Sequence, residues 1–123
     1  MVARPSLLET FDEGQATWLL RERGSGTRAS LEALLSAREL DPPRMVLGSN
    51  GAVLAAAVAG LGAALVSADA VAVELGSGDL VVVPVEGTPL LRPWHLVTGL
   101  TPTPATRLFV EHVLSVPGWR SAP

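Results

Sequence analysis

The longest stretch without a charged side chain, from Met45 to Ala68, constrains the fold more than any other feature of this sequence. It is longer than the roughly 20 residues that a helix needs to cross a bilayer. The stretch is nevertheless interrupted by a Gly-Ser-Asn-Gly turn that begins at Gly48, and by Gly60 and Gly62. This punctuation favours strand, turn, helix, glycine turn and strand within a buried α/β core over a membrane span.

The same alternation of short apolar runs and amphipathic segments continues along the whole chain. Strands are predicted at residues 16–20, 45–47, 63–66, 80–85 and 92–98. Helices are predicted at residues 6–11 (with Ser6 as N-cap), 28–38, 68–75 and 105–116. A further helix is predicted after the Gly48-Ser49-Asn50 turn and ends at Gly60 and Gly62. Strands that alternate with helices predict an open α/β sheet covered by helices on both faces. Ligands of such sheets bind at the carboxyl ends of the strands, in the loops that enter the helices.

The composition excludes several classes of function. Nine Lys and Arg stand against twelve Asp and Glu in 123 residues, and no basic cluster occurs, so direct nucleic-acid binding is not expected. The absence of cysteine excludes a disulfide scaffold, a thiolate zinc site and a cysteine nucleophile. The two histidines, His95 and His112, are expected to be structural. No metal or cofactor is therefore expected. No enzymatic activity is expected either, because no nucleophile–base pair is visible. Charged residues interrupt any secretory pattern at the N-terminus, so a cytoplasmic location is expected.

The loop Gly24-Ser25-Gly26-Thr27-Arg28 joins a predicted strand to a predicted helix. Its glycines let the backbone approach a ligand, and the free amides and dipole of the helix favour negative charge there. Ser25 and Thr27 add hydroxyl donors, and Arg28 adds a charged fork suited to carboxylate, phosphate or sulfur oxyanions. From the spacing alone, simple capping of the helix by Ser25 or Thr27 is the favoured interpretation, and an anion site is the alternative.

A second loop, Gly48-Ser49-Asn50-Gly51, also leads from a strand into a helix. Ser49 and Asn50 are both good helix caps, and capping is the favoured interpretation, although Asn50 is also able to reach a ligand. The run Gly60-Leu61-Gly62 has a dinucleotide-like spacing, but it falls at the end of a helix. It is therefore not interpreted as a nucleotide-binding fingerprint.

These segments together resemble the effector-binding domain of LysR-type transcriptional regulators. The order and spacing of the segments carry the resemblance, which covers about Pro5 to Val116. The most similar branch contains regulators of carbon-fixation operons and of sulfur assimilation. The segments are Trp18–Arg28, Leu47–Asn50, Ala59–Ser67, Leu80–Gly87, Arg92–Val97 and the closing helix Thr103–Leu114.

The resemblance implies a type II periplasmic-binding-protein fold, in which two α/β lobes hold a small anionic metabolite between them. It implies that residues 1–17 are a crossover segment, 18–88 the second lobe, 89–116 the return strand and C-terminal helix of the first lobe, and 117–123 a tail. The effector-facing loops of the family match Ser25, Gly26, Thr27, Arg28, Ser49 and Asn50. Gly51 departs from the larger, often acidic residue that is common there, so only a backbone role carries over to it.

The helix-turn-helix that precedes this domain in the family has no counterpart in the sequence. We therefore expect the effector-sensing piece of a regulator, with a free-standing solute-binding lobe or an inert remnant as the alternatives. We also expect a homo-oligomer, because the predicted strand at 92–98 and the apolar face of the last helix need partners. Packing of that helix on its own lobe is the alternative. The sequence names neither the effector, nor the promoter, nor the direction of control.

Overall fold

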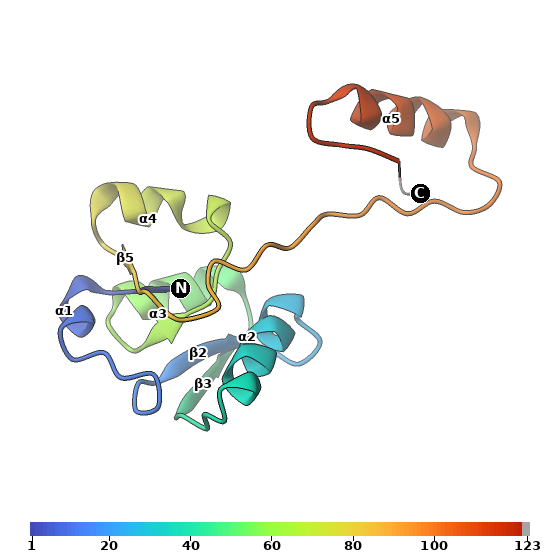
Figure 1. The fold of residues 1–123 in the computed structure, drawn as a ribbon. Helices are drawn as coiled ribbons and strands as arrows, with labels where there is room; N and C mark the ends of the chain where they lie inside the picture. Colours follow the sequence, from blue (N-terminus) through green and yellow to red (C-terminus); the bar gives the residue numbers. More distant parts are fainter. Residues whose placement is uncertain (122–123) are drawn as a thin grey trace. The chain divides into compact units, whose positions relative to one another are not determined.

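The computed structural model describes residues 1–121 and divides the chain into two units, residues 1–90 and the residues from Leu91 onward. Unit 1 holds five strands, β1 (Val2–Ala3), β2 (Trp18–Arg21), β3 (Arg44–Leu47), β4 (Ala63–Ala64) and β5 (Val81–Val82). It also holds α1 (Pro5–Leu8), α2 (Gly26–Ala37), α3 (Asn50–Val58), the 3-10 turn η1 (Asp69–Val71) and α4 (Ala72–Ser77). Unit 2 contains α5 (Pro104–Ser115) (Figure 1).

The five strands form one sheet in the order β3-β2-β4-β1-β5. Strand β2 is parallel to both of its neighbours, and β1 is antiparallel to β4 and β5. The predicted open α/β sheet is therefore confirmed, with one strand that sequence patterning did not identify. Strand β1 was missed because two residues are too few to show the alternation that marks a strand.

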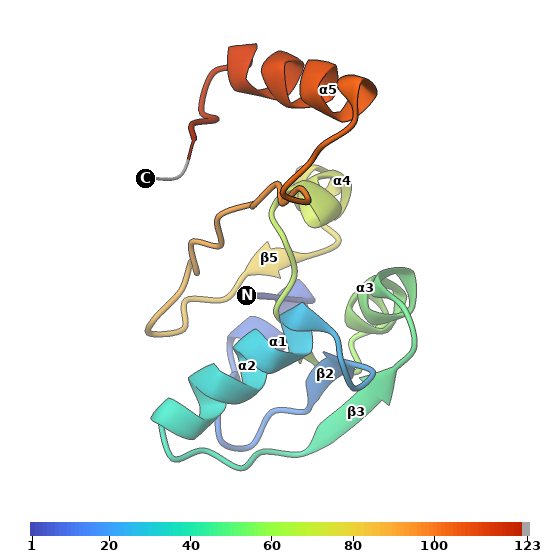
Figure 2. The ribbon, with the colours of Figure 1, turned by 90° about the vertical axis from the view of Figure 1, so that its right-hand side faces the viewer.

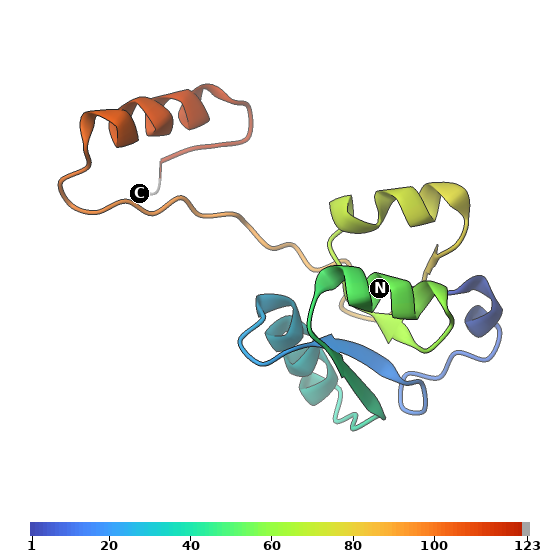
Figure 3. The same cartoon turned by 180° about the vertical axis from the view of Figure 1, so that it is seen from behind.

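Helices cover both faces of this sheet, and each face has its own apolar core (Figure 2). Trp18 and Leu20 point toward α2, where they meet Leu31 and Leu35. Leu19, between them, points to the opposite face. There it packs with residues of α3, η1 and the segment before β5, namely Val53, Ala56, Ala57, Val71 and Leu80. The ribbon of α3 lies over this face of the sheet (Figure 3). Because both faces of the inner strands β2 and β4 are buried, these strands are apolar in consecutive positions, whereas Val46 and Val82 of the edge strands β3 and β5 are exposed.

Two glycines explain the Gly-Leu-Gly run after α3. Gly60 has a φ of +79°, a left-handed conformation that ends a helix at little cost in glycine. A Cβ on Gly62 would lie 2.2 Å from the carbonyl oxygen of Thr17. Gly62 therefore lets β4 approach β2 closely enough for the Ala63 amide to donate to Thr17 at 2.9 Å. Neither glycine faces a phosphate-binding turn, in agreement with the rejection of a nucleotide fingerprint.

Several predicted elements differ from those observed. The strand predicted at residues 92–98 is not formed, and its residues are exposed. A strand needs a neighbour to accept its hydrogen bonds, and β-propensity alone does not supply one. The helix predicted at 6–11 is a single turn that begins after Arg4, so Ser6 is not its N-cap. The uncharged run 45–68 is divided among β3, α3 and β4, and none of the described helices has the length and apolarity for crossing a membrane. The last two residues of the predicted tail lie outside the described residues.

Candidate functional site

The two loops singled out in the sequence begin side by side at one edge of the sheet. Strands β2 and β3 are parallel, and their last residues, Arg21 and Leu47, are paired in the register. The loops that follow lead into α2 and α3, which lie on opposite faces of the sheet (Figure 2). The helix N-termini and their loops therefore share the carboxyl edge of the parallel strands, where open α/β sheets bind ligands.

The first of these helices, α2, begins without a side-chain cap. Ser25 occupies the N-cap position, but its hydroxyl makes no capping hydrogen bond. The first amide bonded to this position is that of Ala29, which donates to the Ser25 carbonyl oxygen at 3.1 Å. Within the described residues, no acceptor bonds the amides of Gly26, Thr27 and Arg28. The helix therefore begins with backbone donors and a Ser25 hydroxyl that have no partner among the described residues. Simple capping by Ser25 is not observed.

Arg28 is anchored rather than free. Its Nε donates to Glu32 Oε1 at 2.8 Å, one turn along α2, and its Nη1 donates to the carbonyl oxygen of Arg21 at 3.3 Å. The side chain is largely buried, with 17% of its surface exposed. Arg28 therefore fixes the start of α2 to the end of β2, and its Nη2 is the nitrogen without such a bond.

The second helix, α3, is capped as expected. The Ser49 hydroxyl accepts a hydrogen bond from the Ala52 amide at 3.0 Å, so its role as N-cap is confirmed. Asn50, the first residue of the helix, is exposed, and its Oδ1 accepts a hydrogen bond from Arg21 Nη1. Asn50 is therefore the residue through which the second loop contacts the first.

Arg21 connects the two loops, and sequence reasoning did not identify it as a site residue. Its Nε and Nη2 each donate to one carboxylate oxygen of Glu22 at 2.7 Å. These hydrogen bonds lower the pKa of Glu22 from 4.5 to about 2, and they raise the pKa of Arg21. A signal was present in the sequence, since an Arg-Glu pair ends a buried strand directly before a glycine-rich loop.

Two hollows adjoin these residues. A shallow depression of about 400 Å³ lies over the start of α2 and is lined by Arg23, Gly24, Ser25, Gly26, Arg28, Ala29 and Glu32. A small gap of about 10 Å³ shares Arg28 with this depression, and there Thr27, Arg21 and Asn50 meet apolar side chains of the core. The structure thus brings together Ser25, Gly26 and Arg28 in one hollow and Thr27, Arg28 and Asn50 in the other. Ser49 lines neither.

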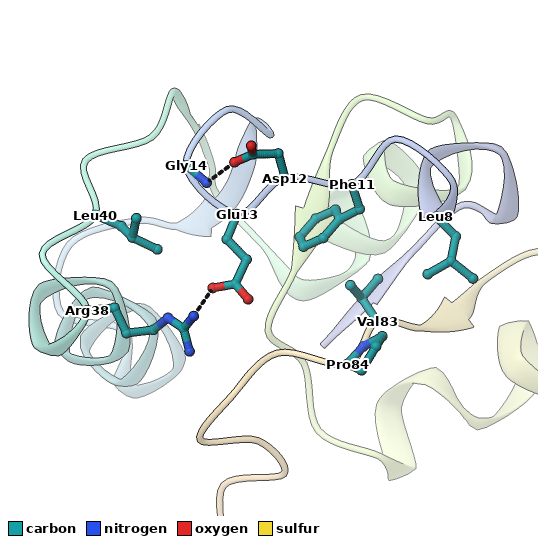
Figure 4. A pocket seen from close by; sticks show the side chains of 9 residues that line it. All are labelled: Leu8, Phe11, Asp12, Glu13, Gly14, Arg38, Leu40, Val83 and Pro84. Carbon is teal, nitrogen blue, oxygen red and sulfur yellow. Dashed lines mark hydrogen bonds and ion pairs between the residues drawn. The ribbon is translucent and has the colours of Figure 1, made fainter.

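A larger hollow of about 500 Å³ lies beyond the C-terminal end of α2 and shares no residue with the predicted site (Figure 4). Its walls combine apolar side chains with Asp12, Glu13 and Arg38, and the Asp12 carboxylate accepts a hydrogen bond from the Gly14 amide at 2.8 Å. Arg38 lies 2.8 Å from Glu13 and 3.3 Å from Glu86. The lining residues are Leu8, Phe11, Asp12, Glu13, Gly14, Arg38, Leu40, Val83 and Pro84. Arg38 is thus already neutralised by two carboxylates, although its buried Nε has no hydrogen-bond partner among the described residues. We locate the candidate site at the other end of α2, where three consecutive amides have no acceptor.

The described residues contain no cluster of three or more His, Asp or Glu side chains that could hold a metal ion. His95 and His112, expected to be structural, are both exposed. The donors without a partner at the carboxyl edge, among the described residues, are the amides of Gly26, Thr27 and Arg28, the hydroxyls of Ser25 and Thr27, and Nη2 of Arg28. Such a set suits the binding of an oxyanion.

Comparison with known proteins gives one family. The model of the LysR substrate binding domain matches residues 4–117. The HTH-type transcriptional regulator CbbR of Sinorhizobium medicae is 42% identical over 102 residues, which cover 80% of this chain and 33% of that protein. A RuBisCO operon transcriptional regulator of Acidithiobacillus ferrooxidans is 38% identical over 101 residues, with 80% and 33% covered. The chain thus spans about a third of the length of these relatives.

A solved structure has the same fold. The regulatory domain of CcmR from Synechocystis PCC6803, determined in complex with 2-PG, matches with a TM-score of 0.80 at 24% identity. The match covers 95% of this chain and 61% of that domain. The periplasmic-binding-protein-like α/β architecture expected from the sequence is therefore confirmed.

Proposed function

The chain belongs to the LysR substrate-binding domain family, and from that premise we propose that it is the effector-sensing part of a LysR-type transcriptional regulator. Its ligand is a small anionic metabolite, bound at the carboxyl edge of the sheet in the cytoplasm. Binding there controls the DNA binding or transcriptional activity of the whole regulator. The chain itself binds no DNA and catalyses no reaction.

One observation carries the proposal of an anionic ligand. Helix α2 presents three consecutive amides without acceptors, together with the uncapped Ser25 hydroxyl. An N-terminus of this kind attracts negative charge through its partial positive charge and its free donors. Thr27 and Arg28 extend the same set of donors, whereas Ser49 is already used as a cap. The proposed contacts of the first loop are therefore Ser25, Gly26, Thr27 and Arg28, and Asn50 is the proposed contact of the second.

The names of the similar proteins support the interpretation of this chain as part of a regulator rather than of a transport protein. Curated relatives from several bacteria are named as transcriptional regulators of the CbbR kind or of RuBisCO operons. The CcmR domain was solved with 2-PG, but at 24% identity that likeness concerns the fold. For this chain, 2-PG is therefore a useful probe alongside inorganic phosphate and sulfate.

The test is calorimetric or NMR titration of the 123-residue chain with these three anions. Thr27→Ala and Ser25→Ala should each weaken binding by on the order of 1–2 kcal/mol, the loss of a hydrogen bond to a charged group. Ser36→Ala, an exposed change in the last turn of the same helix, serves as the control and should leave affinity unchanged. Equal affinities for all three variants, or no binding of any of the probes, would refute the assignment.

A further inference from the structure

Every guanidinium nitrogen of Arg21 is engaged within the chain. Nε and Nη2 bind the two oxygens of Glu22, and Nη1 binds Oδ1 of Asn50. The pair of parallel bonds to Glu22 is the arrangement in which a guanidinium group binds a carboxylate or phosphate ligand. Arg21 thus already holds a carboxylate at the edge of the sheet where the family fold and the free amides of α2 direct a ligand.

The two partners of this ion pair differ in how firmly they are held. Arg21 ends a paired β-strand, its carbonyl oxygen accepts from Arg28, and its guanidinium is bonded to Asn50 at the start of α3. Its side chain is 21% exposed. Glu22 lies just outside the strand, and its side chain is 46% exposed. Within residues 1–121, Arg21 is the only side-chain partner of its carboxylate. Glu22 can therefore turn into solvent without opening the core, whereas Arg21 stays in place.

We propose that the Glu22 carboxylate is an internal competitor of the ligand, occupying the Arg21 guanidinium until a bidentate oxyanion displaces it. The proposal rests on the proposed function, because it concerns an anion at the same edge of the sheet. The ligand class it selects is a carboxylate or a phosphate, whose two oxygens can take the place of the two oxygens of Glu22. A halide can make no such pair of bonds.

The charges around the site agree with this role. Arg28 is likewise paired with a carboxylate of the chain, Glu32. Arg21 and Arg28 are therefore neutralised internally, whereas Arg23, which lines the hollow over the start of α2, is in none of the ion pairs of the described residues. An approaching anion gains the Arg21 guanidinium only when Glu22 leaves it. Because the hydrogen bonds from Arg21 hold the pKa of Glu22 near 2, the carboxylate is ionised near neutral pH and competes fully.

The experiment compares anion binding by the 123-residue chain and by Glu22→Gln, using inorganic phosphate, 2-PG and chloride at constant ionic strength. Removal of the competing charge should tighten phosphate and 2-PG binding by about 3- to 5-fold, the range of one exposed ion pair. Chloride binding should change much less. Glu9→Gln changes the net charge equally on an exposed residue in the loop after α1, and it should change affinity by less than 2-fold or so.

Two further variants make the outcome decisive. The gain in phosphate and 2-PG affinity should vanish when Glu22→Gln is combined with Arg21→Gln, because the Arg21 guanidinium that Glu22 occupies is then absent. Glu22→Ala should show the same gain if Glu22→Gln unfolds the chain, as judged by its thermal melting curve. Binding by the unsubstituted chain with no gain in Glu22→Gln relative to Glu9→Gln would overturn the competitor while leaving the proposed function intact. No binding by any variant would overturn both, and a gain of the same size for chloride would overturn the bidentate exchange.

Discussion

Helices α2 and α5 have the same length, but the apolar face of α2 is buried and that of α5 is exposed. Each has 12 residues and an apolar face at helical spacing. In α2, Leu31 and Leu35 are 1% and 2% exposed in the core of unit 1. In α5, Leu108 and Phe109 are 68% and 56% exposed, and none of its residues is buried.

The N-termini of the two helices show the reverse difference. The Thr103 hydroxyl caps α5 by accepting from the Thr106 amide at 3.2 Å, and Pro104 occupies the first helical position. Helix α2 has no such cap. Helix α5 is therefore specified by local signals, whereas α2 is held by packing and keeps its N-terminal donors unused. A helix that tertiary contacts stabilise can leave its first amides available for a ligand.

The sharpest test of this difference is the removal of one leucine from each helix. Leu35→Ala should lower the free energy of unfolding by about 2–5 kcal/mol, because it deletes a fully buried side chain. At concentrations at which the chain is a monomer, Leu108→Ala should change it by less than about 0.5 kcal/mol, as exposed substitutions do. Urea denaturation followed by circular dichroism measures both. Equal losses of unfolding free energy in the two variants would mean that Leu108 is as deeply packed as Leu35.

Much of the fold of unit 1 was predictable because its signals are local and repeated. Apolar runs bounded by glycine identified the regions of β2, β3, β4 and β5, and i, i+3, i+4 spacing identified α2. The strand predicted at 92–98 was wrong for a physical reason: its apolar and β-branched residues describe a tendency that is realised only beside another strand. Strand β1 was missed because its role is set by neighbours that are distant in sequence.

Self-association of the chain stays a prediction, and α5 offers the way to measure it. Burial of one large apolar side chain contributes about 1.5–3 kcal/mol, so the exposed face of α5 favours contact with a second copy. Light scattering should give a mass above that of one chain, and Leu108→Glu should lower it. Leu61→Glu, at a residue 51% exposed in unit 1, is the control. A single-chain mass at micromolar concentration would rule out this expectation.

Alanine at the two N-cap positions, Thr103 and Ser25, tests the difference between the N-termini directly. Thr103→Ala should destabilise α5 by about 1 kcal/mol, because it removes a side-chain cap. Ser25→Ala should cost α2 much less, because its hydroxyl makes no capping bond. Amide hydrogen exchange within each helix reports the two effects separately. A larger loss of protection in α2 than in α5 would show that Ser25 is a structural cap after all.

The candidate site was predictable in its location but not in its internal contacts. Glycines, hydroxyls and the strand-to-helix position identified the Gly24–Arg28 loop, and the Ser49 cap followed from residue type. The engagement of Arg28 with Glu32 and of Arg21 with Asn50 was not predicted, because one sequence does not show which of several reachable partners a long side chain takes. Only the placement of β2 beside β3 brings Arg21 and Asn50 together.

The smallest expected effect is the acid titration of Glu22. Its pKa is lowered from 4.5 to about 2 by the hydrogen bonds from Arg21, so its ionised form is favoured in the folded chain. The stabilisation that this pair contributes is therefore complete above pH 4.5 and is lost as the pH falls toward 2. The side-chain carboxyl carbon of Glu22, followed by NMR, should titrate with a midpoint well below 4.5. A midpoint near 4.5 would contradict the two-bond pairing.

The central claim is that the uncapped start of α2, unlike the capped start of α5, binds an oxyanion. The most direct measurement is an amide chemical-shift titration of the 123-residue chain with inorganic phosphate at constant ionic strength. The account predicts saturable shifts at Gly26, Thr27 and Arg28, and none at Ala105 and Thr106. Equal shifts at both helix starts, or shifts confined to the hollow beside Arg38, would contradict it.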